Sequence, residues 1–342
     1  MFFWQRRPRI NFGVAVLAGG LLLPVALPSA NAATNLASVQ AQVLRLQQQA
    51  TSLAESAQAA QVDLNNLSRK LASVQQQASV QQSSVSSFQK SLGAIAAEQY
   101  KNGGLGQGMQ LLFSSDPTLY LAQAGTLEMI TQKKALQLKK YQVAKQRLVA
   151  TSLTVNDKLA LVKAARARFV AQQTAANAKL KAAQQLLSKL TKADRARLAK
   201  LAAANDSQAQ KYSIAQAAKY KIGSGRGASA LKFALKQIGD RYVFGAAGMI
   251  YWDCSGLVMR AFGSVGVSLP HSAAYQYGYG KFIPRNQLKP GDMVFFGRPI
   301  THVGIYLGNG MMVDAPHSGA RVRVESFGSR FGYEPYIGAK RI

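Results

Sequence analysis

Residues 252–262 read Trp-Asp-Cys-Ser-Gly-Leu-Val-Met-Arg-Ala-Phe, and this stretch decides the fold of the C-terminal part of the chain. Its apolar residues at 257, 258, 261 and 262 share one face of a helix, so we predict a helix that begins at Cys254. Unpaired backbone N–H groups and the dipole at a helix N-terminus stabilise a thiolate. Cys254 is therefore a candidate nucleophile, and the alternative from the residues alone is a small core residue.

Strand patterns with a period of two surround this helix and predict an α+β domain over residues 228–342. Gly308-Asn309-Gly310 has the composition of a hairpin turn between two of the strands. A helix followed by an antiparallel meander is an α+β arrangement. The predicted elements are a helix over 228–238, the helix at Cys254, and strands within 288–296, 301–307, 311–314 and 321–324.

A histidine and a carboxylate are available to assist the cysteine. A thiolate nucleophile needs a base, and the base needs a group that orients it. His302 lies on a predicted strand, and Asp314 follows 12 residues later across the hairpin turn, so both side chains can be neighbours on paired strands. Cys254, His302 and Asp314 are the candidate catalytic set.

The composition limits the partners and cofactors of the chain. It has 342 residues, a net charge of +28 and one cysteine. One cysteine excludes an internal disulfide and any Cys-rich zinc or iron–sulfur site, so we expect no metal and no other cofactor. The charge indicates a nucleic acid, a membrane surface or an acidic polymer as partner. Residues 133–225 carry 20 basic and three acidic residues, which is +17 of the excess.

Residues 1–32 have the three-part pattern of a secretory signal peptide: a basic start, an apolar stretch and small residues that end at Ala32. We expect cleavage after Ala32. The alternative is a retained membrane anchor, because the 18 residues of 10–27 could just span a bilayer. In both cases the rest of the chain is secreted or extracytoplasmic, at the cell wall or membrane surface. Nucleic acid is then excluded as a partner.

The N-terminal half predicts a long coiled coil. From Leu36 the apolar residues keep a 3-4 spacing that requires a partner helix, and residues 126–221 supply one with a looser stripe. We predict an antiparallel helical hairpin over 33–222 with an apolar tip around 100–125. Residues 223–227 read Gly-Ser-Gly-Arg-Gly and predict a linker to the second domain.

Two roles for this hairpin remain open. It is either a spacer or dimerisation rod, or an arm that binds a partner and regulates the second domain, which the apolar tip favours. The basic residues of 133–221 are either a solvated face or a surface that holds anionic wall polymers or lipid head groups. Arg166 and Gln173 fall in the stripe of the second helix, so we expect kinks there.

Three segments of the C-terminal domain, 253–258, 290–296 and 302–308, resemble the NlpC/P60 family of cell-wall cysteine peptidases. The resemblance implies a papain-like α+β fold and cleavage of peptidoglycan stem peptides between D-γ-glutamate and a diamino acid. It implies Cys254 as nucleophile and His302 as general base. The third residue is Asp314 by position in the hairpin, with His317 as the alternative.

The same resemblance implies that Tyr242, Asp253 and Ser255 lie near the oxyanion or bind the substrate. From the residues alone, other roles stay open for two of them. Asp253 could simply stabilise the helix start by its charge, and Tyr242 could only pack.

The hairpin resembles the coiled-coil segment of PcsB-like hydrolases, and the whole layout resembles actinobacterial Rip-type endopeptidases. This implies docking of the tip onto an FtsEX-type membrane complex during cell division, and we expect the arm to keep the enzyme inactive until then. The rival is a non-enzymatic wall or division adaptor with a degenerate peptidase domain. A third possibility is acyl transfer to or from a lipid. The residues that carry the hairpin resemblance are Tyr100, Gly103, Gly104, Leu111, Leu112, Ser114, Ser115 and Leu127.

Overall fold

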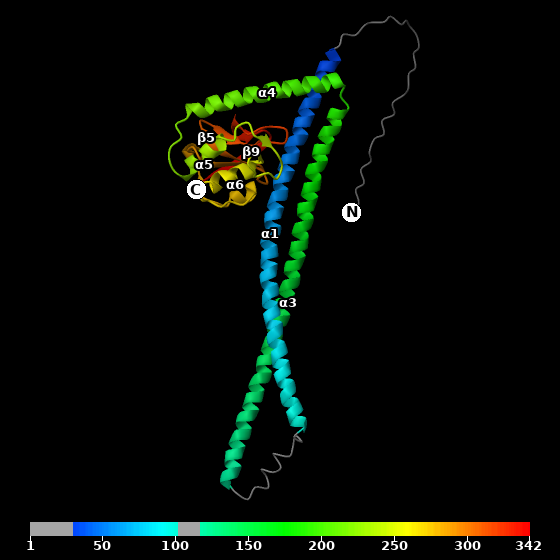
Figure 1. Cartoon of the computed structure of the whole chain (residues 1–342), viewed down its shortest axis with the longest axis vertical. Helices are drawn as coiled ribbons and strands as arrows, with labels where there is room; N and C mark the ends of the chain where they lie inside the picture. The colour runs from blue at the N-terminus through cyan, green and yellow to red at the C-terminus, as the bar shows by residue number, and fades with distance from the viewer. Residues whose placement is uncertain (1–29, 102–116) are drawn as a thin grey trace, which may run out of the picture.

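The computed structural model describes residues 30–101 and 117–342 of the chain (Figure 1). A helical hairpin followed by a sheet-rich α+β domain is present, as predicted. Residues 1–29 of the expected signal peptide and residues 102–116 of the expected tip lie outside the described residues. In the described part, no helix is both long and apolar enough to cross a bilayer.

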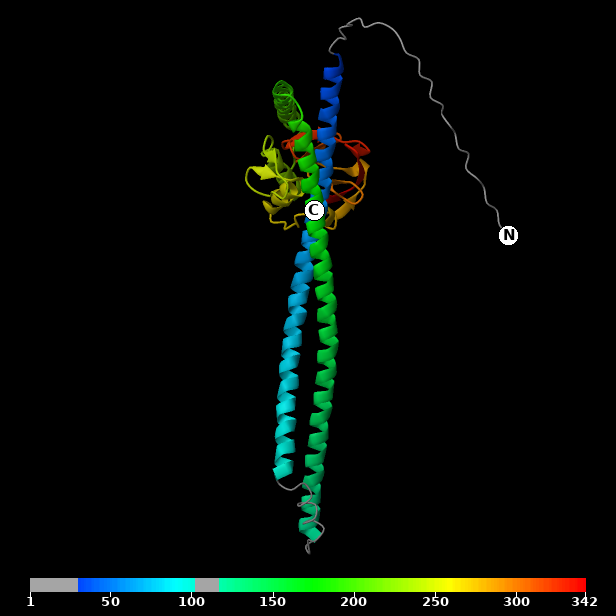
Figure 2. The ribbon, with the colours of Figure 1, turned by 90° about the vertical axis from the view of Figure 1, so that its right-hand side faces the viewer.

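The hairpin consists of α1 (Ala30–Lys101) and α3 (Pro117–Ser188), each of 72 residues. They lie side by side and form a rod that projects from the C-terminal domain (Figure 2). At a rise of 1.5 Å per residue each helix is about 110 Å long. Alanines supply much of the buried surface, so the helices can approach closely although each contact buries little area. The buried alanines are Ala50, Ala54, Ala57, Ala60, Ala165, Ala176 and Ala183.

The second arm of the hairpin is shorter than predicted. Helix α3 ends at Ser188, and α4 (Lys192–Lys219) leaves the hairpin and crosses to the C-terminal domain (Figure 1). Thr191 caps α4, because its hydroxyl accepts a hydrogen bond from the N–H of Asp194 at 3.1 Å. The predicted hairpin over 33–222 is therefore wrong for its last segment, where this cap starts a new helix.

Arg166 and Gln173, where the sequence predicts kinks or frayed stretches, both lie within the uninterrupted helix α3, so the helix is not frayed there. Near Arg166 the buried position is Ala165, and Arg166 itself is exposed. Further along the helix, Ala176 and Ala183 of the predicted stripe are buried.

The C-terminal domain begins with α5 (Arg226–Leu235), so the helix includes two residues of the predicted linker. Gly225 precedes it with a φ of 107°, a backbone conformation that favours glycine. The other helical elements are α6 (Cys254–Gly263), α7 (Ala273–Gln276) and the 3₁₀ turn η1 (Arg285–Gln287).

Six strands form an antiparallel sheet in the order β3-β9-β4-β5-β6-β7, and β8 pairs with β9. Strands β1 and β2 form a separate parallel pair. The predicted strand over 321–324 starts later, because the backbone of Val322 forms hydrogen bonds with Gly239 and Asp240 at 2.9 Å and 2.8 Å. The strands are β1 (Arg241–Tyr242), β2 (Tyr251–Trp252), β3 (Lys281–Ile283), β4 (Met293–Phe296), β5 (His302–Gly308), β6 (Met311–Asp314), β7 (Arg323–Ser326), β8 (Arg330–Phe331) and β9 (Glu334–Arg341).

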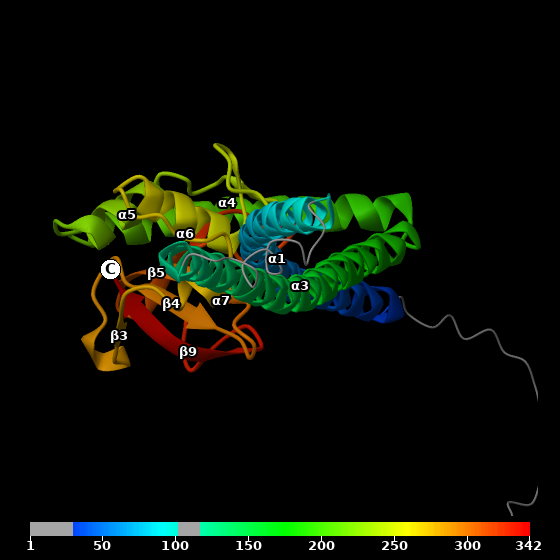
Figure 3. The ribbon, with the colours of Figure 1, turned by 90° about the horizontal axis from the view of Figure 1, so that it is seen from below.

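The core lies between the sheet and the helices α5 and α6, which occupy one side of the strands (Figure 3). Leu257, Val258 and Phe262 of α6 are fully buried, as their helical spacing predicts. Helix α4 covers the outer strand β7, where the N–H of Val324 donates to the Ser213 hydroxyl at 2.8 Å. The arm is thus attached to the domain through α4 as well as through α1.

Candidate active site

Cys254 is the first residue of α6, as the sequence predicts. The Asp253 carboxylate caps this helix and accepts a hydrogen bond from the N–H of Gly256 at 2.6 Å. The role left open for Asp253 at the helix start is therefore present in the structure. The Cys254 side chain is fully buried, so its access depends on what covers it.

His302 and Asp314 lie on the neighbouring strands β5 and β6, and His302 Nε2 is 2.8 Å from Asp314 Oδ2. Use of Nε2 in this contact leaves Nδ1 of the imidazole for another partner. Burial opposes protonation of His302, but the hydrogen bond and charge of Asp314 outweigh it and raise its pKa. The ring stacks on Phe331 with centroids 4.7 Å apart, which fixes the plane of the imidazole.

His317 has a different partner. Its Nδ1 donates to the carbonyl oxygen of Ser318 at 3.0 Å, while Asp314 makes the contact with His302. Burial is the main cause that lowers the pKa of His317. Of the two candidates for a third residue, the structure therefore brings Asp314 onto the imidazole.

Tyr242, Asp253 and Ser255 surround the thiol. Burial, and next the charge of Cys254, raise the pKa of Tyr242 well above its usual value. The Asp253 carboxylate also contacts His271, whose Nε2 lies 2.8 Å and 2.9 Å from its two oxygens. Sequence reasoning could not bring His271 to Asp253, because the two residues lie 18 positions apart and on different elements.

Glu55 of α1 reaches into this site from the hairpin. Its Oε1 accepts hydrogen bonds from the Cys254 thiol at 3.1 Å and the Ser255 hydroxyl at 2.6 Å. Its Oε2 accepts from the N–H of Ala273 at 3.0 Å. Glu55 is 2% exposed. A carboxyl group of the arm therefore occupies the position directly beside the thiol.

This arrangement opposes the thiolate that the helix start was expected to favour. Burial is the largest cause that raises the pKa of Cys254 well above its usual value, followed by the charges of Glu55 and Asp253. Burial, then Asp253, also raises the pKa of Glu55 itself, although its three hydrogen bonds act the other way. In this arrangement burial and the two neighbouring carboxylates favour the protonated thiol of Cys254 over the thiolate.

Other residues of α1 hold the hairpin against the same face. The Ser52 hydroxyl donates to Glu334, and it lies 2.9 Å from the Tyr333 hydroxyl. Further along the helix, the Tyr275 hydroxyl donates to Asp63. Sequence reasoning missed Glu55 and these contacts, since an acidic residue beside an alanine stripe reads as a solvated helix face.

Comparison with known proteins identifies the domain. Residues 239–341 match the model of the NlpC/P60 family. The C-terminal domain is an NlpC/P60 domain. The chain is 40% identical over 121 residues to the peptidoglycan endopeptidase RipA of Mycobacterium tuberculosis, across 31% of this chain and 25% of that protein. It is 43% identical over 90 residues to the probable endopeptidase p60 of Listeria monocytogenes, across 26% of this chain and 19% of that protein.

The chain thus matches a quarter or less of the length of these two relatives. Among solved structures, NlpC2 from Trichomonas vaginalis has 30% sequence identity and a TM-score of 0.33, and the match covers 36% of this chain and 49% of that one.

The contact between His302 and Asp314 leads to a prediction for the variant Asp314→Asn. Removal of the carboxylate charge leaves burial as the dominant influence, so the pKa of His302 falls below its value in the parent protein. NMR titration of the histidine ring protons measures this pKa. His271 serves as the internal control, because its shift comes from Asp253 and Glu55. An unchanged His302 titration contradicts the role of Asp314.

Proposed function

We propose that this chain is a secreted cell-wall hydrolase that cleaves peptidoglycan stem peptides at the D-γ-glutamyl–diamino acid bond. Cys254 is the nucleophile, His302 the general base and Asp314 the group that orients the imidazole. The observation that carries the proposal is the 2.8 Å His302–Asp314 contact in a domain whose cysteine begins α6. The names of the relatives, peptidoglycan endopeptidase and probable endopeptidase, support the substrate class.

The proposed reaction uses these groups in turn. His302 Nδ1 takes the thiol proton, and the sulfur of Cys254 attacks the scissile carbonyl carbon. The resulting oxyanion accepts hydrogen bonds from the N–H of Cys254 and the hydroxyl of Tyr242. Collapse breaks the C–N bond while the imidazolium protonates the leaving amine, and water then hydrolyses the thioester and restores the thiol.

Two further residues bind the substrate in this proposal. Asp253 and Ser255 flank the nucleophile, and their oxygens are 3.3 Å apart. When Glu55 is absent from the site, the Ser255 hydroxyl loses its 2.6 Å acceptor and becomes available to a substrate. Asp253 presents a carboxylate that a free amine of the peptide can meet.

The hairpin regulates this activity in the proposal. Glu55 of α1 fills the space beside the thiol where a scissile carbonyl must sit, and it keeps the sulfur protonated. The arm therefore has to leave before substrate enters. Docking of the hairpin tip onto an FtsEX-type membrane complex is the proposed release signal, which would confine cleavage to sites of cell division.

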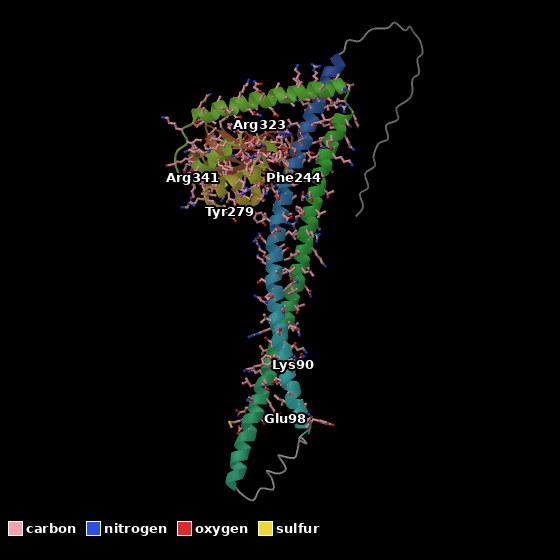
Figure 4. All side chains as sticks on the ribbon, in the orientation of Figure 1. Lys90, Glu98, Phe244, Tyr279, Arg323 and Arg341 are labelled. Atoms are coloured by element: carbon pink, nitrogen blue, oxygen red, sulfur yellow. The ribbon has the colours of Figure 1, made fainter. Side chains whose placement is uncertain are left out.

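A basic surface along the arm supports a location at the wall or membrane. Helix α3 has 12 lysines and arginines against two acidic residues over 128–188, and most of these side chains project from the rod (Figure 4). We propose that residues 133–221 hold anionic wall polymers or lipid head groups. Such contacts weaken as salt screens them.

Product analysis on whole peptidoglycan tests the proposed reaction. Mature full-length protein in which Glu55→Ala removes the arm's carboxyl is expected to release peptides that end in D-γ-glutamate, identified by mass spectrometry. Adding Cys254→Ala is expected to abolish their release, because no other thiol exists in the chain. Release that survives Cys254→Ala contradicts the mechanism. No release by either protein, with unchanged peptidoglycan binding, favours the adaptor.

Thiol alkylation tests the regulatory contact. Glu55→Ala in the full-length chain is expected to increase the rate of Cys254 alkylation by iodoacetamide about tenfold or more, since it removes a blocking group and a negative charge. The matched control is Glu98→Ala, which removes an exposed glutamate far along the same helix (Figure 4). Equal rates in all three proteins would mean that α1 does not limit access to the thiol.

The contact of Glu55 with Cys254 predicts that closure, the docking of the arm over the thiol, depends on pH. Burial, then Asp253, raises the pKa of Glu55 above its ordinary value of 4.5, so the closed form takes up a proton there. Closure is therefore favoured as the pH falls through the raised pKa, and this contribution is lost as the pH rises above it.

The measurement is the alkylation rate of the parent protein divided by that of Glu55→Ala at each pH, which cancels the ordinary ionisation of the thiol. This ratio is expected to rise with pH. A ratio that is flat or falls between pH 5 and pH 8 rejects the coupling between Glu55 protonation and closure.

A further inference from the structure

Asp314 faces an arginine on the neighbouring strand. In the antiparallel pair of β6 and β7, Asp314 lies directly opposite Arg323, which Figure 4 labels beneath α4. Residues opposite each other on paired strands have their side chains on the same face, with Cβ atoms about 5 Å apart. The planar guanidinium of arginine matches a carboxylate and often forms two hydrogen bonds with it. The strand register alone therefore predicts an ion pair between Arg323 and Asp314.

The structure shows a different pairing. Arg323 forms its ion pair with Glu325, two residues further along the same strand. Asp314 contacts His302 Nε2 through Oδ2, and its Oδ1 is buried and accepts no hydrogen bond from the described residues. A buried carboxylate oxygen without a donor is costly, and a donor from Arg323 would remove that cost. Glu325 and Asp314 thus compete for one arginine, and Glu325 binds it.

This competition decides how much negative charge acts on the imidazole of His302. Burial opposes protonation of His302, but the hydrogen bond and the charge of Asp314 raise its pKa overall. An arginine paired with Asp314 would neutralise that charge and draw the carboxylate away from Nε2, which lowers the pKa of the imidazole. A weaker base takes the thiol proton less readily, so the proposed reaction slows.

Other charged and titratable groups also face the imidazole or the pair of Arg323 and Glu325, from the sheet and from α4. They are His317 after β6, Glu334 on β9, and Arg195 and Asp206 on α4. Asp206 already pairs with Arg321 at 3.5 Å. The α1 residues that line the cavity between α1, α4 and this face of the sheet carry no charge. In the part of the chain that the structure describes, Glu325 is the acid in ion-pair contact with Arg323.

We propose that Glu325 is a positioning residue of the active site: it holds Arg323 and so reserves the Asp314 carboxylate for His302. This rests on the proposed function, in which His302 is the general base. Glu325 contacts neither the thiol nor the scissile bond in this proposal, and it acts only through Arg323 and Asp314.

The hold on Arg323 depends on pH. Burial, then the charge of Asp314, raises the pKa of Glu325 to about 7. Glu325 is therefore a carboxylate above pH 7, and its charge is lost as the pH falls through that value. Arg323 is then free to pair with Asp314, so His302 loses its carboxylate partner on the acid side.

The test is a double-mutant cycle of Glu325→Gln and Arg323→Gln in the full-length chain. Two NMR signals of His302 are followed: the midpoint of its titration, and the ring Nε2–H proton hydrogen-bonded to Asp314. Glu325→Gln is expected to lower the midpoint by about one pH unit and to remove the Nε2–H signal. Arg323→Gln alone is expected to change little, since Glu325 without its cation takes up a proton. The double variant is expected to regain both signals of the parent.

The matched control is Glu334→Gln, which removes another carboxylate whose charge acts on His302 but which does not pair with Arg323. It is expected to lower the midpoint while the Nε2–H signal stays. Adding Arg323→Gln to it is expected to leave the Nε2–H signal as it is. The control thus separates the effect of a nearby charge from the effect of a released arginine.

Activity gives a second readout, in the Glu55→Ala background at pH 8, where Glu325 is a carboxylate. Glu325→Gln is expected to lower kcat/KM for a γ-glutamyl stem peptide about tenfold, and adding Arg323→Gln to restore it to within about threefold. If the Glu55→Ala protein cleaves no stem peptide, the proposed function fails, and the NMR signals still decide how Arg323 and Asp314 pair.

Two results overturn the inference. One is a Glu325→Gln protein in which both His302 signals are those of the parent. The other is a lowered midpoint with an intact Nε2–H signal, because Glu325 then acts by its charge alone. If Glu325→Gln lowers the melting temperature, Glu325→Asp takes its place, since it keeps the charge but shortens the reach to Arg323. It is expected to weaken the Nε2–H signal, and failure of Arg323→Gln to restore that signal also overturns the inference.

Discussion

The carboxyl group of Glu55 is the contact by which the arm reaches the thiol of the C-terminal domain. Glu55 is buried beside Cys254, far from it in sequence, and three donors of the NlpC/P60 domain satisfy its oxygens. A buried carboxylate without such donors costs several kcal/mol, so the site that receives it must be preformed by the domain. Ser255 and the N–H of Ala273 supply two of those donors, and both flank the place where a substrate carbonyl reacts. The same polar groups thus serve closure and the proposed chemistry in turn.

The proposed release of Glu55 from the thiol depends on how the rest of the arm is attached. Around Glu55 the hairpin uses hydroxyl contacts such as Ser52 with Tyr333 and Tyr275 with Asp63, and small alanines that bury little area. A neutral hydrogen bond such as that of Ser52 with Tyr333 contributes about 0.5–1.5 kcal/mol, and one to a carboxylate, such as that of Tyr275 with Asp63, about 1.5–3 kcal/mol. A partner that binds only the released arm shifts the equilibrium by its difference in affinity for the two states. Helix α4 keeps the arm tethered meanwhile, through the Ser213 contact to strand β7.

The parts of this structure that sequence could predict are those encoded by neighbours in the chain. The helix at Cys254 follows from the apolar spacing after it, and the closeness of His302 and Asp314 follows from one hairpin turn. The break before α4 also has a local signal in the sequence, because Thr191 and Asp194 form a helix cap. Glu55, His271 and Glu334 could not be found this way. Their roles come from contacts between elements, and each reads locally as an ordinary polar residue.

The position of Glu55 has a chemical consequence for the proposed reaction. Glu55 presents a glutamate side-chain carboxyl to the thiol, which is the group that the proposed cleavage of a γ-glutamyl bond leaves there. In that reaction the docked arm therefore mimics the acyl side of the product, and a stem peptide enters only after α1 departs.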